Sequence, residues 1–353
     1  MRNYSNLQNI LYQDNFANRF NNKIMLLDII YLIIGLLLIL WGAGSLTDGS
    51  SAIARKWGVS DLIIGLTVVA FGTSAPELTI SIISAINGNP GIAIGNVVGS
   101  NIFNVLMIVG VTALFRPISI ERNIMTNDIP FVILSAVVLL VIGNTKLLDA
   151  ESTSVISRSD GLLLLLFFVI FLRYTFTQVK KESTPIPLER KTQVEKQEPE
   201  MKMLKAAIWV VLGLAALIFG GDRFVAGASG IARGLGVSDA IIGLTIVAAG
   251  TSLPELATSV MAALKGKTGI ALGNVIGSNI YNIFLVLGCS ATIRQLPFGD
   301  INNIDLLTLT GGCLLFWIFG WFFRERTITR PEGAIMTLCY IAYITYLVLQ
   351  SAT

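Results

Sequence analysis

The sequence predicts an all-α polytopic membrane protein whose ten transmembrane helices form two inverted five-helix repeats. The 353-residue chain is 54% hydrophobic and 13% charged, with a mean hydropathy of +0.73, whereas soluble chains carry about 25% charged residues. Ten apolar stretches approach or exceed the roughly 20 residues that cross a bilayer. A 47-residue segment also occurs twice, at 58–104 and 236–282, which indicates a duplication.

The ten apolar stretches divide equally between the two halves of the chain. The first five lie at 24–44, 61–86, 92–114, 128–143 and 162–179. The second five lie at 203–220, 239–264, 270–293, 305–323 and 334–349. Because each half has an odd number of spans, the second half enters the membrane from the opposite side. The repeat is therefore expected to be inverted.

The same pattern predicts the domain organisation. Residues 1–23 form a polar N-terminal segment, 24–179 the first five-helix repeat, 180–202 a cytoplasmic linker and 203–353 the second five-helix repeat. The N-terminal segment has no basic and apolar leader with a cleavage site, so the first apolar stretch is expected to remain as a span. The linker is rich in Lys, Glu and Pro, which favours a solvated tether over a regulatory module.

The distribution of basic residues predicts the orientation. Most of the 25 lysines and arginines fall on one side of the predicted bundle, among them Arg55, Lys56, Arg116, Arg122, Lys265, Lys267 and Arg330. Cytoplasmic loops are enriched in these residues, so both termini are expected outside the cell. The net charge of +3 mostly reflects this asymmetry. The expected surroundings are therefore a lipid bilayer and no nucleic acid, and the sequence predicts no oligomeric state.

Each copy of the duplicated segment carries one glutamate inside an apolar stretch. The copies are identical at 31 of 47 positions, and Glu77 and Glu255 are equivalent. A carboxylate at this depth costs at least about 2.5 kcal/mol, so it normally marks an ion or substrate pathway. The alternative is a structural role, as a protonated glutamate bonded across helices. An inverted repeat would bring both glutamates to the pseudo-twofold axis, facing each other.

The motif Gly-Thr-Ser-x-Pro-Glu surrounds each glutamate, at 72–77 and 250–255. Proline lacks an N–H and its ring clashes with the carbonyl four residues back, so Pro76 is expected to free the carbonyl oxygens of Gly72 and Thr73. Oxygen atoms are the ligands of hard cations. Hydroxyl groups lie in the same turns, on Thr73, Ser74, Thr251 and Ser252. Alternatively, these hydroxyls bond back to their own helices.

A second motif, Gly-Asn-x-x-Gly-Ser-Asn-Ile-(Phe/Tyr)-Asn, occurs at 95–104 and 273–282. Its glycines have the spacing that lets helix backbones approach closely. Polar side chains recur every four residues on one helical face, at Asn96, Ser100, Asn104, Asn274, Ser278 and Asn282. This stripe either bonds helices together or completes an ion cage.

The residue types available favour hard cations. The chain has no histidine, and its three cysteines, Cys289, Cys313 and Cys339, have no CxxC spacing and are expected to be packing residues. Zinc, copper and iron, which prefer imidazole and thiolate, are therefore disfavoured relative to sodium and calcium. Two ionised glutamates balance one divalent or two monovalent ions. Mutually exclusive occupancy of one pocket is the basis of exchange, and no cofactor is expected besides the transported calcium and sodium ions.

At these two motifs the chain resembles the cation/calcium exchanger superfamily, specifically its sodium/calcium exchanger-like prokaryotic members. The resemblance implies a multi-pass protein of the prokaryotic cell (inner) membrane that exchanges calcium for sodium by alternating access, with four ion sites at mid-membrane. For calcium, it implies the carboxylates of Glu77 and Glu255 and the carbonyls of Thr73 and Thr251. For sodium, it implies the hydroxyls of Ser74, Ser100, Ser252 and Ser278 and the carbonyls of Ala70 and Ala248.

The chain departs from some family members at Asn282, where they have an aspartate. The potassium-dependent branch relies on an acid there, so potassium co-transport is not expected. Asn282 and its equivalent Asn104 are included among the expected ion ligands. The alternatives are a proton-coupled calcium antiporter, a passive cation channel, which needs no counter-ion, and a serine hydrolase. An enzyme is disfavoured, because neither histidine nor lysine is available in the motifs as a general base.

Overall fold

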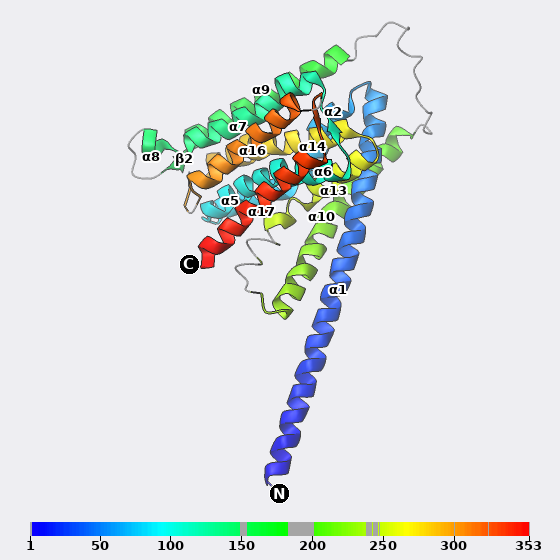
Figure 1. Cartoon of the computed structure of the whole chain (residues 1–353), viewed down its shortest axis with the longest axis vertical. Coiled ribbons are helices and arrows are strands. Elements are labelled where there is room, and N and C mark those ends of the chain that lie inside the picture. The colour runs from blue at the N-terminus through cyan, green and yellow to red at the C-terminus, as the bar shows by residue number, and fades with distance from the viewer. Residues whose placement is uncertain are drawn as a thin grey trace.

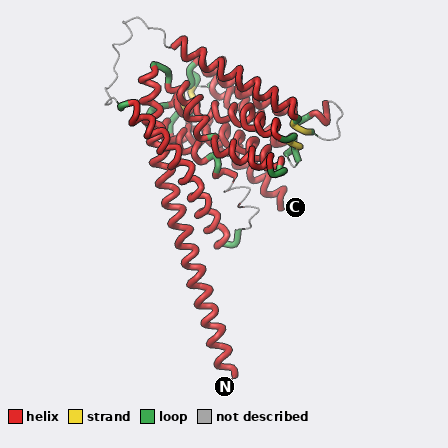
Figure 2. Tube along the Cα trace, turned by 180° about the vertical axis from the view of Figure 1, so that it is seen from behind, coloured by secondary structure: helices red, strands yellow, loops and turns green. Residues whose placement is uncertain are grey.

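The fold is a single bundle of helices (Figures 1 and 2). A computed structural model describes residues 2–148, 154–182, 201–237, 242, 246, 248–299, 301–323 and 325–352, with side chains of the first helix described from Met25 onwards. Almost all of these residues are helical, which confirms the predicted all-helical class. Most of the predicted linker 180–202 lies outside the described residues.

Nine of the ten predicted spans are present in the described residues. Eight helices are long and apolar enough to cross a membrane, at Met25–Trp57, Pro90–Phe115, Ile124–Ile142, Arg158–Gln178, Met203–Gly234, Thr268–Ile293, Asn303–Phe322 and Arg330–Gln350. The bent pair Asp61–Thr73 and Ala75–Ile86 gives a ninth, with 45° between its parts. The predicted span 239–264 lies partly outside the described residues, and its described part includes α13 (Leu253–Leu264).

The elements of the first half are α1 (Arg2–Trp57), α2 (Asp61–Ile64), the π-helical turn η1 (Gly65–Val69), α3 (Ala70–Thr73), α4 (Ala75–Ile86), α5 (Pro90–Ile102), η2 (Phe103–Ile108), α6 (Val109–Phe115), β1 (Ile118–Ser119), η3 (Ile124–Asp128), α7 (Ile129–Ile142), α8 (Thr145–Leu148), β2 (Val155–Ile156) and α9 (Arg158–Glu182). Those of the second half are α10 (Met203–Gly234), α12 (Ala248–Gly250), α13, α14 (Thr268–Ile280), η6 (Tyr281–Leu287), α15 (Gly288–Ile293), β3 (Leu296–Pro297), α16 (Asn303–Phe322), β4 (Thr327–Ile328) and α17 (Arg330–Ala352).

Two helices extend beyond their predicted spans. The stretches at 24–44 and 203–220 were expected to end at residues 44 and 220, but α1 continues to Trp57 and α10 to Gly234. In α1 the extension contains Ser45, Thr47, Ser50 and Ser51, which are all buried. Hydropathy scores such residues as polar and ends the span, whereas in the fold they face other helices. The backbone of the predicted polar segment 1–23 is helical from Arg2 and continuous with α1.

Glycines let α1 and α10 pack backbone against backbone. A Cβ added at Gly42 would lie 2.7 Å from the carbonyl oxygen of Gly213, and one at Gly220 would lie 2.9 Å from that of Gly35. Because the early part of α1 meets the late part of α10, the two helices run antiparallel, side by side in Figure 1. The spacing is seven residues on both helices, at Gly35, Gly42 and Gly49 and at Gly213, Gly220 and Gly227.

Two short antiparallel sheets join the halves at their ends. β1 pairs with β4 through Ile118 and Ile328, and β2 pairs with β3 through Ile156 and Leu296. Each sheet therefore contains one strand from each half. The buried apolar core lies between α5, η2, α7, α14 and η6, so the two copies of the second motif form the centre of the bundle.

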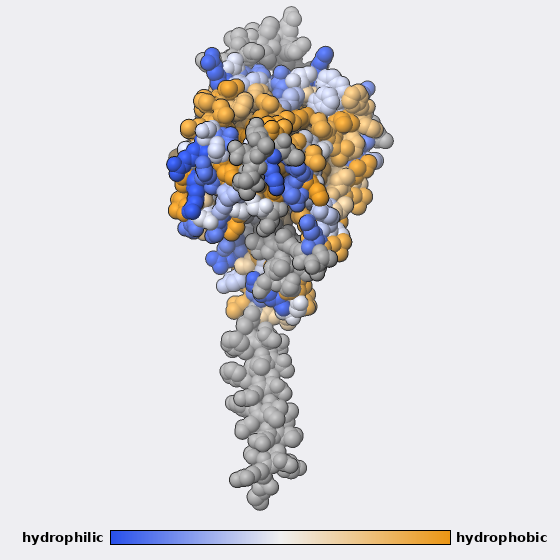
Figure 3. All heavy atoms as spheres, turned by 90° about the vertical axis from the view of Figure 1, so that its left-hand side faces the viewer, coloured by the Kyte–Doolittle hydropathy of each residue, from blue (hydrophilic) through white to orange (hydrophobic). Residues whose placement is uncertain are grey.

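The outer surface of the bundle is apolar. Many large hydrophobic side chains are exposed, including Leu162, Leu166, Val169 and Ile170 of α9. Figure 3 shows hydrophobic residues over much of one face of the bundle. Such a surface is expected of helices that face lipid.

Candidate ion site

The two glutamates lie at the starts of helices that follow a break. Ser74 separates α3 from α4, and Ser252 immediately precedes α13. The breaks arise because Pro76 and Pro254 cannot donate to the preceding turn. No helical hydrogen bond crosses from Glu77 N to the carbonyl of Thr73, or from Glu255 N to that of Thr251, among the described residues. The expected free carbonyls of the two threonines are therefore present at both breaks.

The copies meet through reciprocal hydrogen bonds at the glutamates. Ser74 Oγ donates to Glu255 Oε1 at 3.4 Å, and Ser252 Oγ donates to Glu77 Oε1 at 3.5 Å. Glu77 and Glu255 are 0% and 1% exposed. The prediction that the duplication brings both carboxylates together is confirmed. The serine hydroxyls bond across the copies rather than back to their own helices.

Several buried oxygen atoms of the two duplicated motifs lack hydrogen-bond partners in the described part of the chain. They are the Oε2 atoms of Glu77 and Glu255, the hydroxyls of Ser100, Ser278 and Thr251, and the Oδ1 atoms of Asn104 and Asn282. Each unpaired buried polar group costs about 1–3 kcal/mol, so such a cluster demands an explanation. A hard cation is coordinated by several oxygens of this kind, and the residues present fit sodium and calcium.

A transition-metal site does not fit these residues. Among the described residues no three His, Cys, Asp or Glu side chains converge. The site offers two carboxylates and otherwise neutral oxygens, which are ligands for sodium and calcium rather than for zinc or copper.

The polar stripe divides into two roles. Asn96 Nδ2 donates to the carbonyl of Glu77 at 3.3 Å and to Ser81 Oγ at 3.1 Å. Asn274 Nδ2 donates likewise to the carbonyl of Glu255 at 3.1 Å and to Ser259 Oγ at 3.0 Å. These two asparagines bond helices together, whereas Ser100, Ser278 and Asn104 carry unpaired atoms.

Sequence reasoning missed four residues that organise the site. Ser81 and Ser259 bind the stripe asparagines, and both lie four residues after a glutamate, a spacing that could have indicated them. Asn101 and Asn279 connect α5 with α14, because Asn101 Nδ2 donates to the carbonyl of Asn279 at 3.1 Å. The signal for this pair was its repetition within the second motif. Asn282 Nδ2 joins the same connection by donating to Asn101 Oδ1 at 3.0 Å.

The two expected alanine carbonyls differ. The carbonyl of Ala70 accepts a hydrogen bond from Ser74 N at 3.0 Å, and Thr73 Oγ1, whose single proton is donated to Asn274, lies 3.4 Å from it. In the second copy, Ser252 N donates to Ala249 rather than to Ala248. The Ala70 oxygen is therefore already engaged in this structure, and the two breaks are not identical.

A cavity of about 290 Å³ lies beside the site, against Thr251. It lies between α10, the start of α4 and the break before α13, and Thr251, Val225 and Asp222 line it. The equivalent positions in the other copy are more buried: Thr73 and Thr47 are 0% exposed, whereas Thr251 and Val225 are partly exposed. The side occupied by Thr73 and Thr47 is closed.

Comparisons with known proteins cover nearly the whole chain. The family described as sodium/calcium exchanger protein matches residues 27–177 and 205–349. The putative antiporter CaxA of Alkalimonas amylolytica is 39% identical over 90% of this chain and 98% of its own length. The sodium/calcium exchanger MaX1 of Methanosarcina acetivorans is 34% identical over 90% of this chain and 97% of its own length.

A solved structure is similar over the same extent. The sodium-calcium exchanger NCX_Mj, in crystals soaked with Na⁺ and Ca²⁺, matches with a TM-score of 0.75 and 34% identity. The match covers 90% of this chain and 98% of that structure. At this identity and coverage, the likeness extends to the sequence as well as the fold.

Proposed function

The chain belongs to the sodium/calcium exchanger protein family, and we propose that it is a secondary active antiporter that exchanges calcium for sodium across the membrane by alternating access. One observation carries the proposal. Two buried glutamates from the two copies share one site with unpaired oxygen atoms in the same motifs, and a cavity lies against Thr251 on one side of it.

The proposed ligands combine the unpaired oxygens with the other oxygens of the two motifs. Calcium binds between the Glu77 and Glu255 carboxylates and the carbonyls of Thr73 and Thr251. Sodium ions bind beside it, at the remaining oxygens of the two copies: the hydroxyls of Ser74, Ser100, Ser252 and Ser278, the side chains of Asn104 and Asn282, and the carbonyls of Ala70 and Ala248. The unpaired atoms of Ser100, Ser278, Asn104 and Asn282 support this assignment.

Charge balance makes the two cargoes exclusive. Without bound ions, two carboxylates at 0% and 1% exposure would be strongly destabilised. One calcium ion or two sodium ions at the carboxylates neutralise them, and both loads together would leave excess positive charge in a medium that solvates it poorly. The protein therefore switches the side to which the site is open when either cargo fills it, and this couples the two fluxes.

The finer architecture is also part of the proposal. Ten spans in two inverted repeats, at 24–179 and 203–353, are supported by the antiparallel packing of α1 on its equivalent α10 and by the sheets β1–β4 and β2–β3. The 180–202 linker would connect the repeats in the cytoplasm. The protein acts as a transporter within the lipid bilayer, and no enzymatic step or nucleic-acid partner is needed for it.

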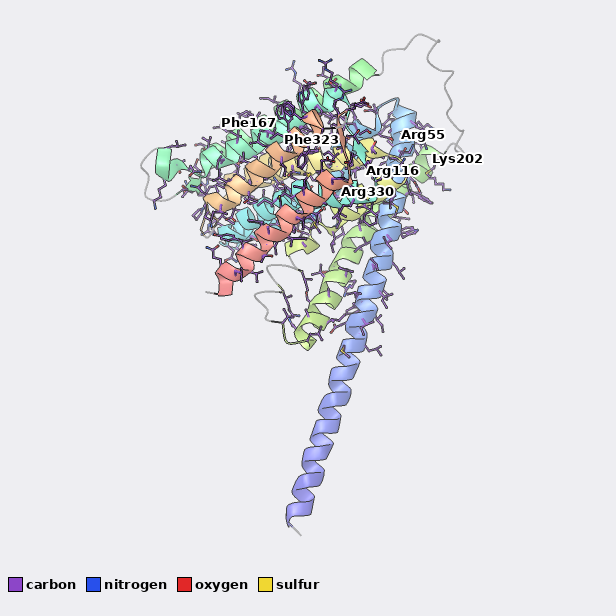
Figure 4. All side chains as sticks on the ribbon, in the orientation of Figure 1. Arg55, Arg116, Phe167, Lys202, Phe323 and Arg330 are labelled. Atoms are coloured by element: carbon purple, nitrogen blue, oxygen red, sulfur yellow. The ribbon has the colours of Figure 1, made fainter. Side chains whose placement is uncertain are left out.

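The basic residues support the proposed orientation. Arg55, Arg116, Lys202 and Arg330 gather at one end of the bundle (Figure 4). Because α1 ends and α17 begins at that end, the other ends of both helices lie opposite. If the basic end is cytoplasmic, both termini lie outside the cell (inner) membrane, and the cavity beside the later part of α10 opens outward.

Vesicle flux tests the coupling directly. Purified protein in vesicles loaded with sodium is diluted into sodium-free buffer with labelled calcium, and the expected result is calcium uptake that depends on the sodium gradient. Uptake that persists unchanged without the gradient would contradict exchange and indicate a channel. Uptake that instead follows an imposed pH gradient would indicate proton coupling.

A further inference from the structure

Thr73 and Thr251 are identical residues at equivalent positions, but their hydroxyls make different contacts. Thr73 Oγ1 donates to Asn274 Oδ1 on α14 at 3.0 Å. Thr251 Oγ1 is also a buried atom; it lies near the Glu77 carboxylate, without a hydrogen bond of standard geometry to a described residue. Its equivalent acceptor would be Asn96 on α5. The duplication thus allows two threonine–asparagine hydrogen bonds, and one of them is formed.

The two asparagines are otherwise held alike. Asn96 and Asn274 each donate from Nδ2 to the backbone of a glutamate and to a serine one turn later. The amides are therefore oriented in the same way within their own copies. The difference is confined to Oδ1, which accepts the hydroxyl of the opposite copy in one case only.

The formed bond lies on the closed side of the site. Thr73 and Asn274 are both 0% exposed. Thr251 lines the cavity, and Asn96 is partly exposed. The bond between Thr73 and Asn274 joins α3 to α14, so it connects the first copy's break to the second copy's core helix. On the cavity side the corresponding connection, from Thr251 directly after α12 to Asn96 on α5, is not formed.

A second pair of equivalent contacts is also formed in only one of its two possible places. Asn282 Nδ2 donates to Asn101 Oδ1 at 3.0 Å. The equivalent pair is Asn104 with Asn279, and Asn104 Nδ2 and Asn279 Oδ1 are both buried without a partner among the described residues. Polar atoms buried without partners are uncommon in folded proteins, and here they occupy the positions that a reciprocal arrangement would satisfy.

We propose that Asn96 and Asn274 are positioning residues that close the ion site on one side at a time, each by accepting a hydrogen bond from the threonine of the other copy. The inference rests on the proposed exchange. In the present state Asn274 holds Thr73 and closes one side. In the opposite state Asn96 holds Thr251, the bond to Thr73 opens, and the cavity moves to the other side.

Equal chemistry on the two sides suits a carrier. Each state contains one formed bond and one unpaired threonine hydroxyl, so the cost of the unpaired group is the same in both. The free-energy difference between the states then remains small, which is the condition under which bound ions can shift the population. Because Thr73 and Thr251 also present the proposed calcium carbonyls, closure and ligand positioning occur together.

Thiol labelling from each side of the membrane tests the assignment. Cys289, Cys313 and Cys339 are first replaced by alanine. Two reporters at equivalent positions are then compared: Val225→Cys, which lines the cavity, and Thr47→Cys, which is 0% exposed on the closed side. A membrane-impermeant thiol reagent is applied under conditions in which its reaction rate is proportional to the population of the state that exposes the reporter.

Removal of each hydroxyl should shift the population in opposite directions. Thr73→Val loses the bond of the present state, so labelling of Thr47→Cys should rise about fivefold, the effect of one net hydrogen bond. Thr251→Val loses the bond of the other state, so the same labelling should fall about fivefold. Thr73→Ser keeps a hydroxyl and should restore the parent rate. Labelling of Val225→Cys, which reports the present state, should shift in the opposite direction in each valine variant, so the fivefold change is read as the ratio of the two labelling rates. Monodisperse elution shows that each variant is folded.

The outcomes separate this inference from the proposed exchange. Shifts in the same direction for both valine variants, unchanged labelling, or no rescue by Thr73→Ser would overturn it. If Thr73→Val does not yield monodisperse protein, Thr73→Ala replaces it with the same expected direction. Sodium-driven calcium flux with unshifted labelling would overturn this inference alone. Opposite shifts without such flux would support the hydrogen-bond assignment and contradict exchange.

Discussion

The two copies of the Gly-Thr-Ser-x-Pro-Glu motif are alike at their centre and different at their edges. At the centre, Ser74 and Ser252 make reciprocal bonds to the opposite glutamate at 3.4 and 3.5 Å. At the edges, Thr73 is bonded and buried, whereas Thr251 is unbonded and lines a cavity. Identical residues therefore adopt two environments in one molecule. The comparison shows that the candidate ion site is symmetric at its centre and that the exposure of its two edges is not.

The largest expected effect is at the symmetric centre. Glu77→Gln and Glu255→Gln should each lower calcium transport by at least about 100-fold, because removal of one partner leaves the other buried charge and the divalent ion uncompensated. The two losses should be equal within a factor of a few, measured as sodium-driven calcium uptake in vesicles. Glu77→Asp and Glu255→Asp, which keep the charge, are the matched controls.

A clear difference between the two glutamine variants would contradict the symmetry of the centre. Near-normal calcium affinity in either variant would show that its glutamate has a structural role and does not bind calcium.

The close packing of α1 on α10 should be the next most sensitive region. Gly42→Ala and Gly220→Ala are equivalent changes whose new methyl groups meet backbone at 2.7 and 2.9 Å. Each should destabilise the protein by about 1–3 kcal/mol, measured as a lower thermal midpoint in detergent. Gly311→Ala is the control, since no described atom lies within 4 Å of its added methyl group. If the control lowers the midpoint as much, helix contact is not the cause.

The asparagine pair at the end of the stripe should give a smaller, unequal effect. Asn282→Asp removes the donor to Asn101 and adds a third carboxylate, so calcium flux should fall about tenfold. Asn104→Asp adds the charge without breaking a hydrogen bond, because both Asn104 amide atoms lack partners among the described residues. Its calcium flux should fall about threefold. Both are measured with potassium present or replaced by choline.

Parent flux should be the same in potassium and in choline, since Asn282 is neutral. Loss of parent flux without potassium would refute the potassium-independent proposal. Equal losses in the two aspartate variants would mean that the Asn282–Asn101 bond contributes nothing.

The smallest effect is expected at an ion pair on the closed side. Lys265 Nζ lies 2.6 Å from Asp48 Oδ1 and donates to the carbonyl of Gly44 at 2.9 Å, whereas the residues equivalent to Lys265 and Asp48 are Asn87 and Ala226. Exposed pairs contribute about 0–1 kcal/mol. Lys265→Met should therefore raise labelling of Thr47→Cys about twofold at low salt and less at high salt. Lys267→Met is the control, and an equal rise in that variant would show that the Lys265–Asp48 ion pair is not the cause.

Much of the fold could be predicted because length, hydropathy and proline act locally. Each span is recognisable in the sequence as an apolar stretch, and Pro76 and Pro254 indicate the breaks. Sequence reasoning failed where polar residues are buried, as at Ser45 and Thr47, because hydropathy cannot distinguish a solvated end from a helix that continues between neighbours. The end of α1 was missed for this reason.

The residues of the candidate site could be predicted, whereas the copy in which the threonine–asparagine bond forms could not. Duplication indicated that Glu77 and Glu255 meet, and the structure confirms that they do. The hydrogen bond of Thr73 to Asn274 and the absence of its equivalent could not be predicted, because the two copies carry the same residues at these positions. A choice between two equal arrangements depends on the rest of the molecule, including pairs such as Lys265 with Asp48 that occur on one side only.

The glycine contact between α1 and α10 also bears on how the protein is made. α1 ends at Trp57, and its partner α10 begins only at Met203. At roughly 5–20 residues per second, the ribosome needs roughly 7–30 s to supply that partner. During this interval the glycine face of α1 has no backbone to pack against and must be covered by lipid or by the insertion machinery. The first half of the chain is thus expected to remain a loosely assembled intermediate until the second half is inserted.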